Sequence, residues 1–216
     1  MITGASSGIG REFARQVAGS GIHVVLVARW ENLLEDLGHE LANDFHVRYR
    51  VVAVDLSVRD SMEGLVERTK DLDIGLVVSN AGTGNPGEFL KIELQTLETL
   101  LRLNALAHLQ IAHFFGRKLT QRRKGGLMLV GAMGAETGVP CMANDGAAKA
   151  YVHSLGQGLH VELNPLGISV TVLAPGLTDT PVLAKFGFNP RTIPVKPMNA
   201  DQCVAVGSGL CRRTDP

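Results

Sequence analysis

The stretch Thr3-Gly4-Ala5-Ser6-Ser7-Gly8-Ile9-Gly10 constrains the fold of this chain more than any other feature. Its three glycines can adopt positive φ angles and let a ligand approach the backbone closely. The helical pattern that begins at Arg11 would offer free N–H groups and a positive dipole end to a pyrophosphate. A short apolar run, residues 23–27, follows that helix. This order of loop, helix and strand predicts a nucleotide-binding turn, with a plain structural turn as the alternative.

The rest of the chain alternates between short apolar runs and longer stretches with helical spacing. The apolar runs, which suit strands buried on both faces, are residues 23–27, 51–54, 76–78, 127–130 and 168–173. The stretches with helical spacing are residues 11–19, 30–45, 61–72, 96–120 and 146–164. This alternation predicts consecutive βαβ units, and therefore an α/β fold with a doubly wound parallel sheet. Residues 1–216 are expected to form a single domain that ends in a long loop and a final helix.

Composition excludes several classes of partner. Lysine plus arginine and aspartate plus glutamate are both 21, so the net charge is zero and supports neither a nucleic-acid nor a membrane-surface partner. Neither a signal peptide nor a membrane span is visible. Cys141, Cys203 and Cys211 have no metal-ligand or redox-pair spacing, which indicates free thiols in a reducing compartment and no metal site. A cytoplasmic location is therefore expected.

Several motifs occur in the order found in one enzyme family. The glycine loop is followed by Asp55, by Asn80-Ala81-Gly82, by Asn104, and by Pro175-Gly176 with Thr178 and Thr180. Together they resemble the classical short-chain dehydrogenase/reductase family across roughly residues 1 to 182. The resemblance implies a Rossmann-type domain that binds a nicotinamide dinucleotide. The residues it assigns to the cofactor are Gly4, Ser6, Ser7, Gly8, Ile9, Gly10, Arg29, Asp55, Leu56, Asn80, Ala81, Gly82, Lys149, Pro175, Gly176, Thr178 and Thr180.

Three of these residues also have a purely structural interpretation. Asp55 at a strand end could cap the next turn. The turn that contains Asn80 could be structural in any α/β protein. Asn104 within a helix could bond to nearby backbone groups. The family interpretation therefore depends on the coincidence of all these motifs.

The end of the second predicted strand, Ala28-Arg29, indicates which cofactor is preferred. An acidic residue there would bind the adenosine ribose and favour NAD. Instead, Arg29 offers a planar guanidinium suited to a 2′-phosphate. The sequence therefore predicts NADP(H), with NAD(H) possible. Alternatively, Arg29 covers the adenine or pairs with Glu31 or Asp36.

The family's catalytic residues are only half present. The family uses a Tyr as proton donor, a Lys four residues later, a Ser thirteen residues before the Tyr, and an Asn. Lys149 and Asn104 match the lysine and the asparagine. The register set by Lys149 places Asp145 at the tyrosine position and Ala132 at the serine position.

Asp145 differs chemically from the phenol it replaces. An unperturbed Asp carboxyl has a pKa of about 3.9, against about 10 for Tyr, and a neighbouring Lys cation lowers it further. An ionised carboxylate cannot protonate a carbonyl oxygen, although it could act as a base. The spacing of four residues also permits a plain Asp145–Lys149 ion pair on the helix surface.

These observations support an oxidoreductase that uses NADP(H) on a small carbonyl or alcohol substrate, with Lys149, Asn104 and Asp145 at the catalytic centre. A catalytically inactive cofactor-binding protein or partner subunit is the alternative, and a lyase or isomerase with Asp145 as base is a third hypothesis. The substrate loop is placed at roughly residues 177–200, where Phe186, Phe188 and Met198 suggest an apolar lid, with core packing as the alternative. By resemblance, the helices that begin near residues 96 and 146 would form a homodimer or homotetramer.

Only Met1-Ile2 precedes the glycine loop, where the family has a buried central strand. The chain also stops before the family's usual last strand. We therefore expect a sheet that lacks most of its first strand and its last strand, as in a fragment or a chain with a misassigned start.

Overall fold

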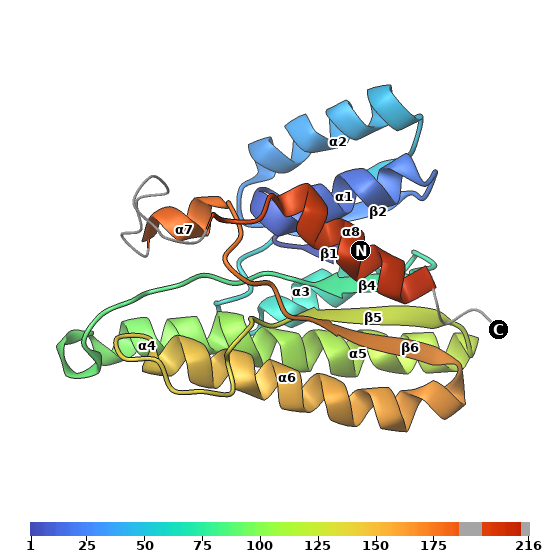
Figure 1. The fold of residues 1–216 in the computed structure, drawn as a ribbon. Coiled ribbons are helices and arrows are strands. Elements are labelled where there is room, and N and C mark those ends of the chain that lie inside the picture. The colour runs from blue at the N-terminus through green and yellow to red at the C-terminus, as the bar shows by residue number, and fades with distance from the viewer. Residues whose placement is uncertain (186–195, 213–216) are drawn as a thin grey trace.

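The computed structural model of this chain describes residues 1–185 and 196–212. Its centre is a six-stranded parallel sheet with the strand order β3-β2-β1-β4-β5-β6 (Figure 1). The strands are β1 (Ile2–Thr3), β2 (Val24–Ala28), β3 (Tyr49–Ala53), β4 (Leu76–Ser79), β5 (Gly125–Val130) and β6 (Ile168–Leu173). The order reverses between β1 and β4, which is where open α/β sheets bind ligands. The predicted doubly wound sheet is confirmed.

Helices cover both faces of the sheet. The α-helices are α1 (Gly8–Gly19), α2 (Glu31–Phe45), α3 (Ser61–Glu67), α4 (Leu94–Leu101), α5 (Ala107–Arg122), α6 (Ala143–Leu163), α7 (Pro181–Lys185) and α8 (Ala200–Arg212). Shorter helical turns are η1 (Phe89–Lys91), η2 (Arg102–Leu106) and η3 (Asn164–Leu166). Helices α1, α2 and α8 pack against one face, and α3, α5 and α6 pack against the other (Figure 1).

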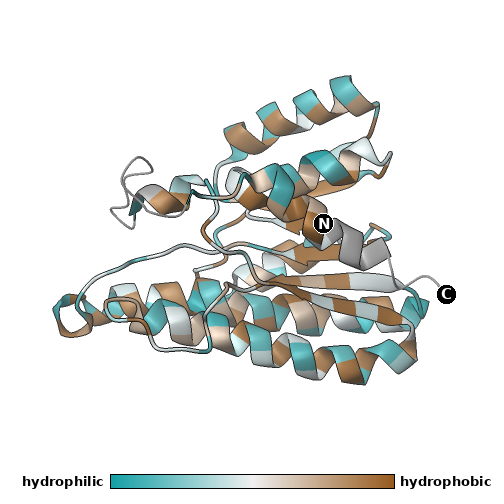
Figure 2. Ribbon diagram, in the orientation of Figure 1, coloured by the Kyte–Doolittle hydropathy of each residue, from teal (hydrophilic) through white to brown (hydrophobic). Residues whose placement is uncertain are grey.

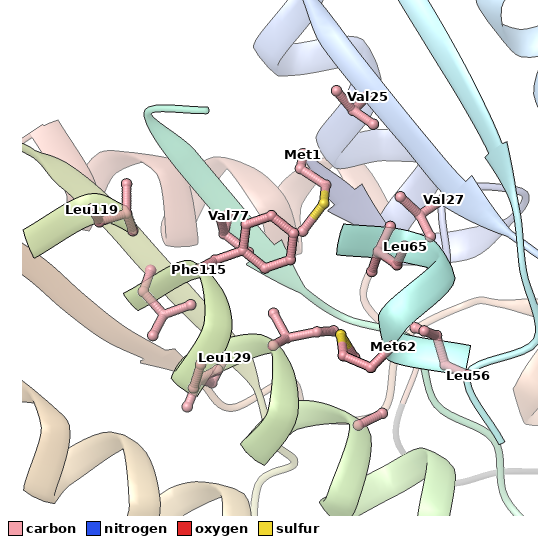
Figure 3. Packing of buried hydrophobic residues seen from close by; sticks show 14 of the residues in the cluster. Met1, Val25, Val27, Leu56, Met62, Leu65, Val77, Phe115, Leu119 and Leu129 are labelled. Carbon is pink, nitrogen blue, oxygen red and sulfur yellow. The ribbon is translucent and has the colours of Figure 1, made fainter. Parts of the chain in front are cut away.

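The core consists of two apolar layers, one on each side of the sheet. Strand residues are apolar over most of their length, whereas the helices carry polar residues on their outer faces (Figure 2). In the layer under α5, the fully buried ring of Phe115 lies beside Val77 of β4 and Met1 (Figure 3). In the opposite layer, Phe13 of α1 and Leu34 of α2 are buried with β2. Burial on both faces explains why the strands read as continuous apolar runs.

The first strand corrects one expectation. β1 has only two residues, yet Ile2 pairs with Leu26 of β2 and also with Val78 of β4. The pairing continues beyond the strand, because Val78 N donates to Met1 O at 2.8 Å and Ala5 N donates to Val27 O at 3.2 Å. The expected truncated sheet is therefore wrong: a full six-stranded sheet is present, and these hydrogen bonds satisfy the backbone groups that flank β1.

The predicted helix over residues 96–120 is divided in the structure. Helix α4 leads into a π-helical turn, η2, which leads into α5. π-Helical turns within α-helices often occur at functional sites. The predicted tail contains α7 and α8, and a parallel bridge joins Thr178 to Met198. Met198 is largely exposed, whereas Phe186 and Phe188 lie outside the described residues. Within the described part of the chain, no helix combines the length and apolar character needed to cross a membrane.

Candidate functional site

A pocket of about 470 Å³ lies where β1, β4, β5 and β6 end. Each of these strands is followed by a turn that contributes to the pocket wall. Of the residues predicted to form the site, those that line it are Gly4, Ser7, Gly8, Ile9, Asn80, Gly82, Asn104, Asp145, Lys149, Pro175, Gly176, Thr178 and Thr180. Ser6, Gly10, Arg29, Asp55, Leu56 and Ala81 are not part of this lining.

The glycine loop connects β1 to the N-terminus of α1. Gly4 has a φ of 67°, a conformation that favours glycine. Gly10 is buried in the first turn of α1, and a Cβ there would overlap the carbonyl oxygen of Gly4. The loop can therefore follow this tight path only with glycine at position 10. The free N–H groups of the first turn of α1 stand at the pocket, where a phosphate group would bind.

Thr3 joins the glycine loop to the turn after β4. Its buried hydroxyl oxygen accepts hydrogen bonds from Asn80 N at 2.9 Å and Ala81 N at 3.0 Å. The Asn80 side chain completes the link, since its Nδ2 donates to Thr3 O at 2.9 Å. Sequence reasoning did not single out Thr3, although it is the first residue of the glycine motif. Its contacts fix the relative position of two walls of the pocket.

Asn104 lies in the π-helical turn η2, with 1% of its surface exposed. Its Oδ1 accepts a hydrogen bond from Thr83 N at 2.9 Å, and its Nδ2 donates to Thr83 O at 2.7 Å. A Cβ added to Gly82 would lie 3.2 Å from Asn104 Oδ1 and 3.3 Å from Lys149 Nζ. Gly82 therefore stands next to both polar groups. Asn104 bonds to the backbone, but to a distant segment rather than to its own helix.

Lys149 and Asp145 lie one turn apart on α6, and both line the pocket. Lys149 Nζ donates to Val130 O at 2.9 Å, and burial lowers the pKa of this amine to about 8. Asp145 is 6% exposed, and its Oδ1 accepts from Asn85 N at 3.2 Å. Burial raises the pKa of Asp145, while the Asn85 N–H and the Lys149 charge oppose that rise. The permitted Asp145–Lys149 ion pair is not formed.

The residues predicted to bind the adenosine end lie beyond the pocket. Arg29 Nη1 is 4.0 Å from Asp55 Oδ2, and its guanidinium carbon is 5.7 Å from the centre of the Trp30 ring. It pairs with neither Glu31 nor Asp36 in the described part of the chain. Asp55 Oδ1 also accepts from Ser57 N at 2.9 Å and from Ser57 Oγ at 2.6 Å, which is the capping contact considered from the sequence. Leu56 is buried in the core.

The segment after β6 forms the remaining wall. Thr178 Oγ1 donates to Gly176 O at 3.0 Å, and the methyl group of Thr180 lies over Gly8. At the end of α7, Lys185 Nζ donates to Thr83 Oγ1 at 2.8 Å. This bond connects the predicted substrate loop to the turn after β4.

Two histidines beside the site had no predicted role. His108 is buried on α5, with its Nδ1 2.8 Å from Ser79 Oγ, and burial lowers its pKa to about 3. His153 lies behind the loop after β5, where its Nε2 accepts from Ala132 N at 3.4 Å and its Nδ1 is 3.1 Å from Glu136 Oε1. The sequence shows no motif for either histidine, because the residues that contact them come from other parts of the chain. Among residues 1–185 and 196–212, no group of three His, Cys, Asp or Glu side chains could hold a metal ion.

The sequence pattern of the family described as short chain dehydrogenase matches residues 1–189. The chain belongs to this family. Short-chain dehydrogenases are NAD(P)-binding oxidoreductases with a Rossmann fold, in agreement with the sheet order and the glycine loop described above.

Individual relatives of this short-chain dehydrogenase include enzymes of known activity. It is 30% identical to a 7beta-hydroxysteroid dehydrogenase of Clostridium sardiniense over 86% of this chain and 71% of that protein. It is 31% identical to a very-long-chain 3-oxoacyl-CoA reductase of Meyerozyma guilliermondii over 90% of this chain. The chain spans only 60% of the length of that reductase.

Solved structures resemble this short-chain dehydrogenase closely. A short-chain dehydrogenase from Sphingobium yanoikuyae in complex with NADPH has a TM-score of 0.92 and 32% identity, covering 98% of this chain and 83% of that chain. A bulky-bulky ketone specific alcohol dehydrogenase from Comamonas testosteroni has a TM-score of 0.88 and 30% identity, covering 98% and 81%.

Proposed function

We propose that this short-chain dehydrogenase is an NADP(H)-dependent oxidoreductase acting on a small carbonyl or alcohol substrate. The observation that carries the proposal is the single pocket that the glycine loop, Lys149 and Asn104 line together. A dinucleotide bound along the glycine loop would place its nicotinamide beside Lys149. The NADPH complex of the Sphingobium relative and the ketone specificity of the Comamonas relative support the cofactor and the substrate class.

The preference for NADP(H) over NAD(H) depends on Arg29. Its side chain is about half exposed, and its Nη1 lies 4.0 Å from Asp55 Oδ2, too far for a hydrogen bond. The guanidinium is therefore available to a 2′-phosphate. Arg pairs well with phosphate because its planar group donates two parallel hydrogen bonds. The backbone and side chains of Gly4 to Gly10, Asp55, Leu56, Asn80 to Gly82 and Pro175 to Thr180 complete the proposed cofactor site.

In this proposal Lys149, Asn104 and Asp145 form the catalytic centre. Lys149 would bind the nicotinamide ribose, and its bond to Val130 O fixes the amine at the end of β5. Asn104 would hold the turn at Thr83 in place. Asp145 and Ala132 occupy the positions where the family resemblance puts the proton-donating Tyr and its Ser partner. Neither of these two residues would supply the hydroxyl group that the family directs at the carbonyl oxygen, so hydride transfer to the carbonyl would be only weakly catalysed.

NADPH oxidation with a panel of ketones and aldehydes tests this proposal. We expect measurable turnover that Lys149→Ala reduces at least ten-fold. Lys70→Ala, which removes an exposed lysine in an ion pair with Glu67, serves as the control and should leave turnover unchanged. Turnover that Lys149→Ala leaves intact would contradict the assigned site.

Asp145 and Ala132 also favour a second candidate, an inactive cofactor-binding protein that acts as a sensor or partner subunit. In that case the chain binds NADPH, but no carbonyl substrate leads to its oxidation. The double variant Asp145→Tyr with Ala132→Ser would then create a carbonyl reductase activity that the natural chain lacks. Activity of the natural chain would exclude this candidate.

We further propose a cytoplasmic protein that assembles as a homodimer or homotetramer through α4, α5 and α6. Apolar side chains exposed on these helices support that surface: Leu94, Leu101, Leu109, Phe114, Tyr151 and Val161. Light scattering of the purified protein tests the assembly. A monomer at micromolar concentration would contradict it.

A further inference from the structure

Asp145 is a buried acid whose carboxylate has no side-chain hydrogen-bond partner among the described residues. Only 6% of its surface is exposed, and it lines the pocket. Its carboxylate accepts a hydrogen bond from the Asn85 N–H at 3.2 Å, and its own backbone N–H also favours the charged form. In the described part of the chain, no lysine, arginine or hydroxyl side chain bonds to it. A buried carboxylate that has no charged side chain bonded to it is stabilised when a group of opposite charge binds beside it.

The nearest cation does not meet this need. Lys149 lies one turn along α6, but its Nζ donates to the carbonyl oxygen of Val130. The facing loop after β5 contributes Ala132 and Met133, which supply no hydrogen-bonding side chain. Val139, Met142 and Leu177 add further apolar side chains to the wall. Among the described residues that line this largely apolar pocket, Asp145 is the acidic one, and the Lys149 amine in the same lining is held at Val130 O. The carboxylate is therefore complementary to a cation with an apolar body.

We propose that this site reduces protonated imines, with Asp145 as the counter-ion of the C=N⁺–H group. The inference rests on the proposed function, because it needs NADPH bound along the glycine loop. In the reaction, hydride from NADPH forms a new C–H bond at the imine carbon. The C=N π-electron pair moves to nitrogen and neutralises its charge. The products are a neutral amine and NADP⁺, and no proton has to be delivered during the step.

This chemistry fits the residues better than carbonyl reduction does. A carbonyl oxygen becomes an alkoxide as hydride arrives, so it needs a hydrogen-bond donor, and neither Asp145 as a carboxylate nor Ala132 is one. A protonated imine already carries the positive charge that the carboxylate attracts. The N–H of the imine also donates to the carboxylate, whereas a carbonyl oxygen meets lone-pair repulsion there. The site should therefore prefer C=N⁺–H over C=O in molecules of equal shape.

Two bicyclic substrates of similar size test the preference. 3,4-Dihydroisoquinoline supplies a protonated imine within its ring, and 1-tetralone supplies a ketone on a bicyclic frame of similar size. With NADPH and the full chain, we expect kcat/KM for the imine to exceed that for the ketone at least ten-fold. Asp145→Asn keeps the volume and removes the charge, and it should lower the imine-to-ketone ratio at least ten-fold. Asp44→Asn makes the same change on the exposed surface of α2 and should leave the ratio unchanged.

A binding measurement separates this inference from the proposed function. Titration of the protein with protonated tetrahydroisoquinoline, without cofactor, should give binding that Asp145→Asn weakens at least ten-fold. Equal binding by the wild-type protein and Asp145→Asn, or a ketone preference that Asp145→Asn does not alter, would overturn the inference. Failure of NADPH to bind would instead contradict the proposed function, even if the cation still bound to Asp145.

Discussion

Lys149 donates its hydrogen bond to the backbone of Val130, at 2.9 Å, although Asp145 lies one helical turn away. This contact crosses from α6 to the end of β5 and holds the amine at the pocket wall. The amine also stands beside Gly82, where a Cβ would lie 3.3 Å from Nζ. Because the lysine is bonded elsewhere, the carboxylate of Asp145 remains available to a ligand.

Burial of Lys149 predicts how stability depends on pH. Its pKa is lowered from 10.5 to about 8 in the folded chain, so folding disfavours the charged amine. The penalty is fully present below pH 8 and is relieved between pH 8 and 10.5, as the folded site loses its proton before the unfolded chain does. From pH 7.5 to 10, the wild-type protein should gain up to about 3 kcal/mol relative to Lys149→Met. Urea unfolding at each pH measures this difference, and Lys70→Met is the control.

His108 predicts a second pH effect in the acid range. Burial lowers its pKa from 6.5 to about 3, so the folded chain keeps the ring neutral while the unfolded chain takes up a proton. Stability should therefore fall by about 1.4 kcal/mol per pH unit from this group between pH 6.5 and 3. His108→Gln should give a shallower slope in chemical unfolding between pH 6 and 4. His113→Gln, on the exposed face of the same helix, should keep the wild-type slope.

The close packing of Gly10 against Gly4 in the glycine loop predicts the effect of a substitution on NADPH binding. Gly10→Ala should abolish the NADPH-induced rise in melting temperature, because the new methyl group overlaps Gly4 O and forces the loop apart. Gly64→Ala in α3 is the matched control, since a Cβ there meets nothing within 4 Å. That variant should be stabilised by about 0.5–1 kcal/mol and should bind NADPH normally. Normal NADPH binding by Gly10→Ala would contradict the phosphate-loop assignment.

Arg29 predicts the cofactor preference. Arg29→Ala removes a charged partner of the 2′-phosphate and should weaken NADPH binding by about 10- to 100-fold, because such hydrogen bonds contribute about 1.5–3 kcal/mol. NADH lacks the phosphate, so its affinity should change little. Fluorescence titration with both nucleotides measures the ratio. Equal losses for NADPH and NADH would assign Arg29 to the adenine or to Asp55 instead.

The sequence predicted β2, β4 and β5 well because each is an apolar run that is largely buried. β6 at residues 168–173 agrees at both ends. The predicted helix at residues 96–120 was placed correctly, but the π-helical turn around Asn104 was not foreseen. In that turn Asn104 forms hydrogen bonds with Thr83, a residue outside this helix. Local periodicity does not encode such a contact.

The sequence placed Asp145 and Lys149 on one helix, and the structure brings both into the pocket with Asn104. Their hydrogen-bond partners, Asn85 and Val130, could not be predicted, since both partners are backbone groups of other segments. The expectation of a truncated sheet was wrong for a related reason. Ile2 and Thr3 were judged by strand length alone, whereas their pairing with β2 and β4 depends on the whole sheet.

Thermal unfolding of the purified chain, alone and with NADPH or NADH, is the most direct test of the proposed cofactor site. A ligand that binds only the folded state raises the melting temperature, and the rise grows with the logarithm of its concentration divided by its Kd. We expect one cooperative transition whose melting temperature both nucleotides raise, with the larger rise for NADPH. A cooperative transition that neither nucleotide shifts would contradict the cofactor site, and with it the proposed oxidoreductase.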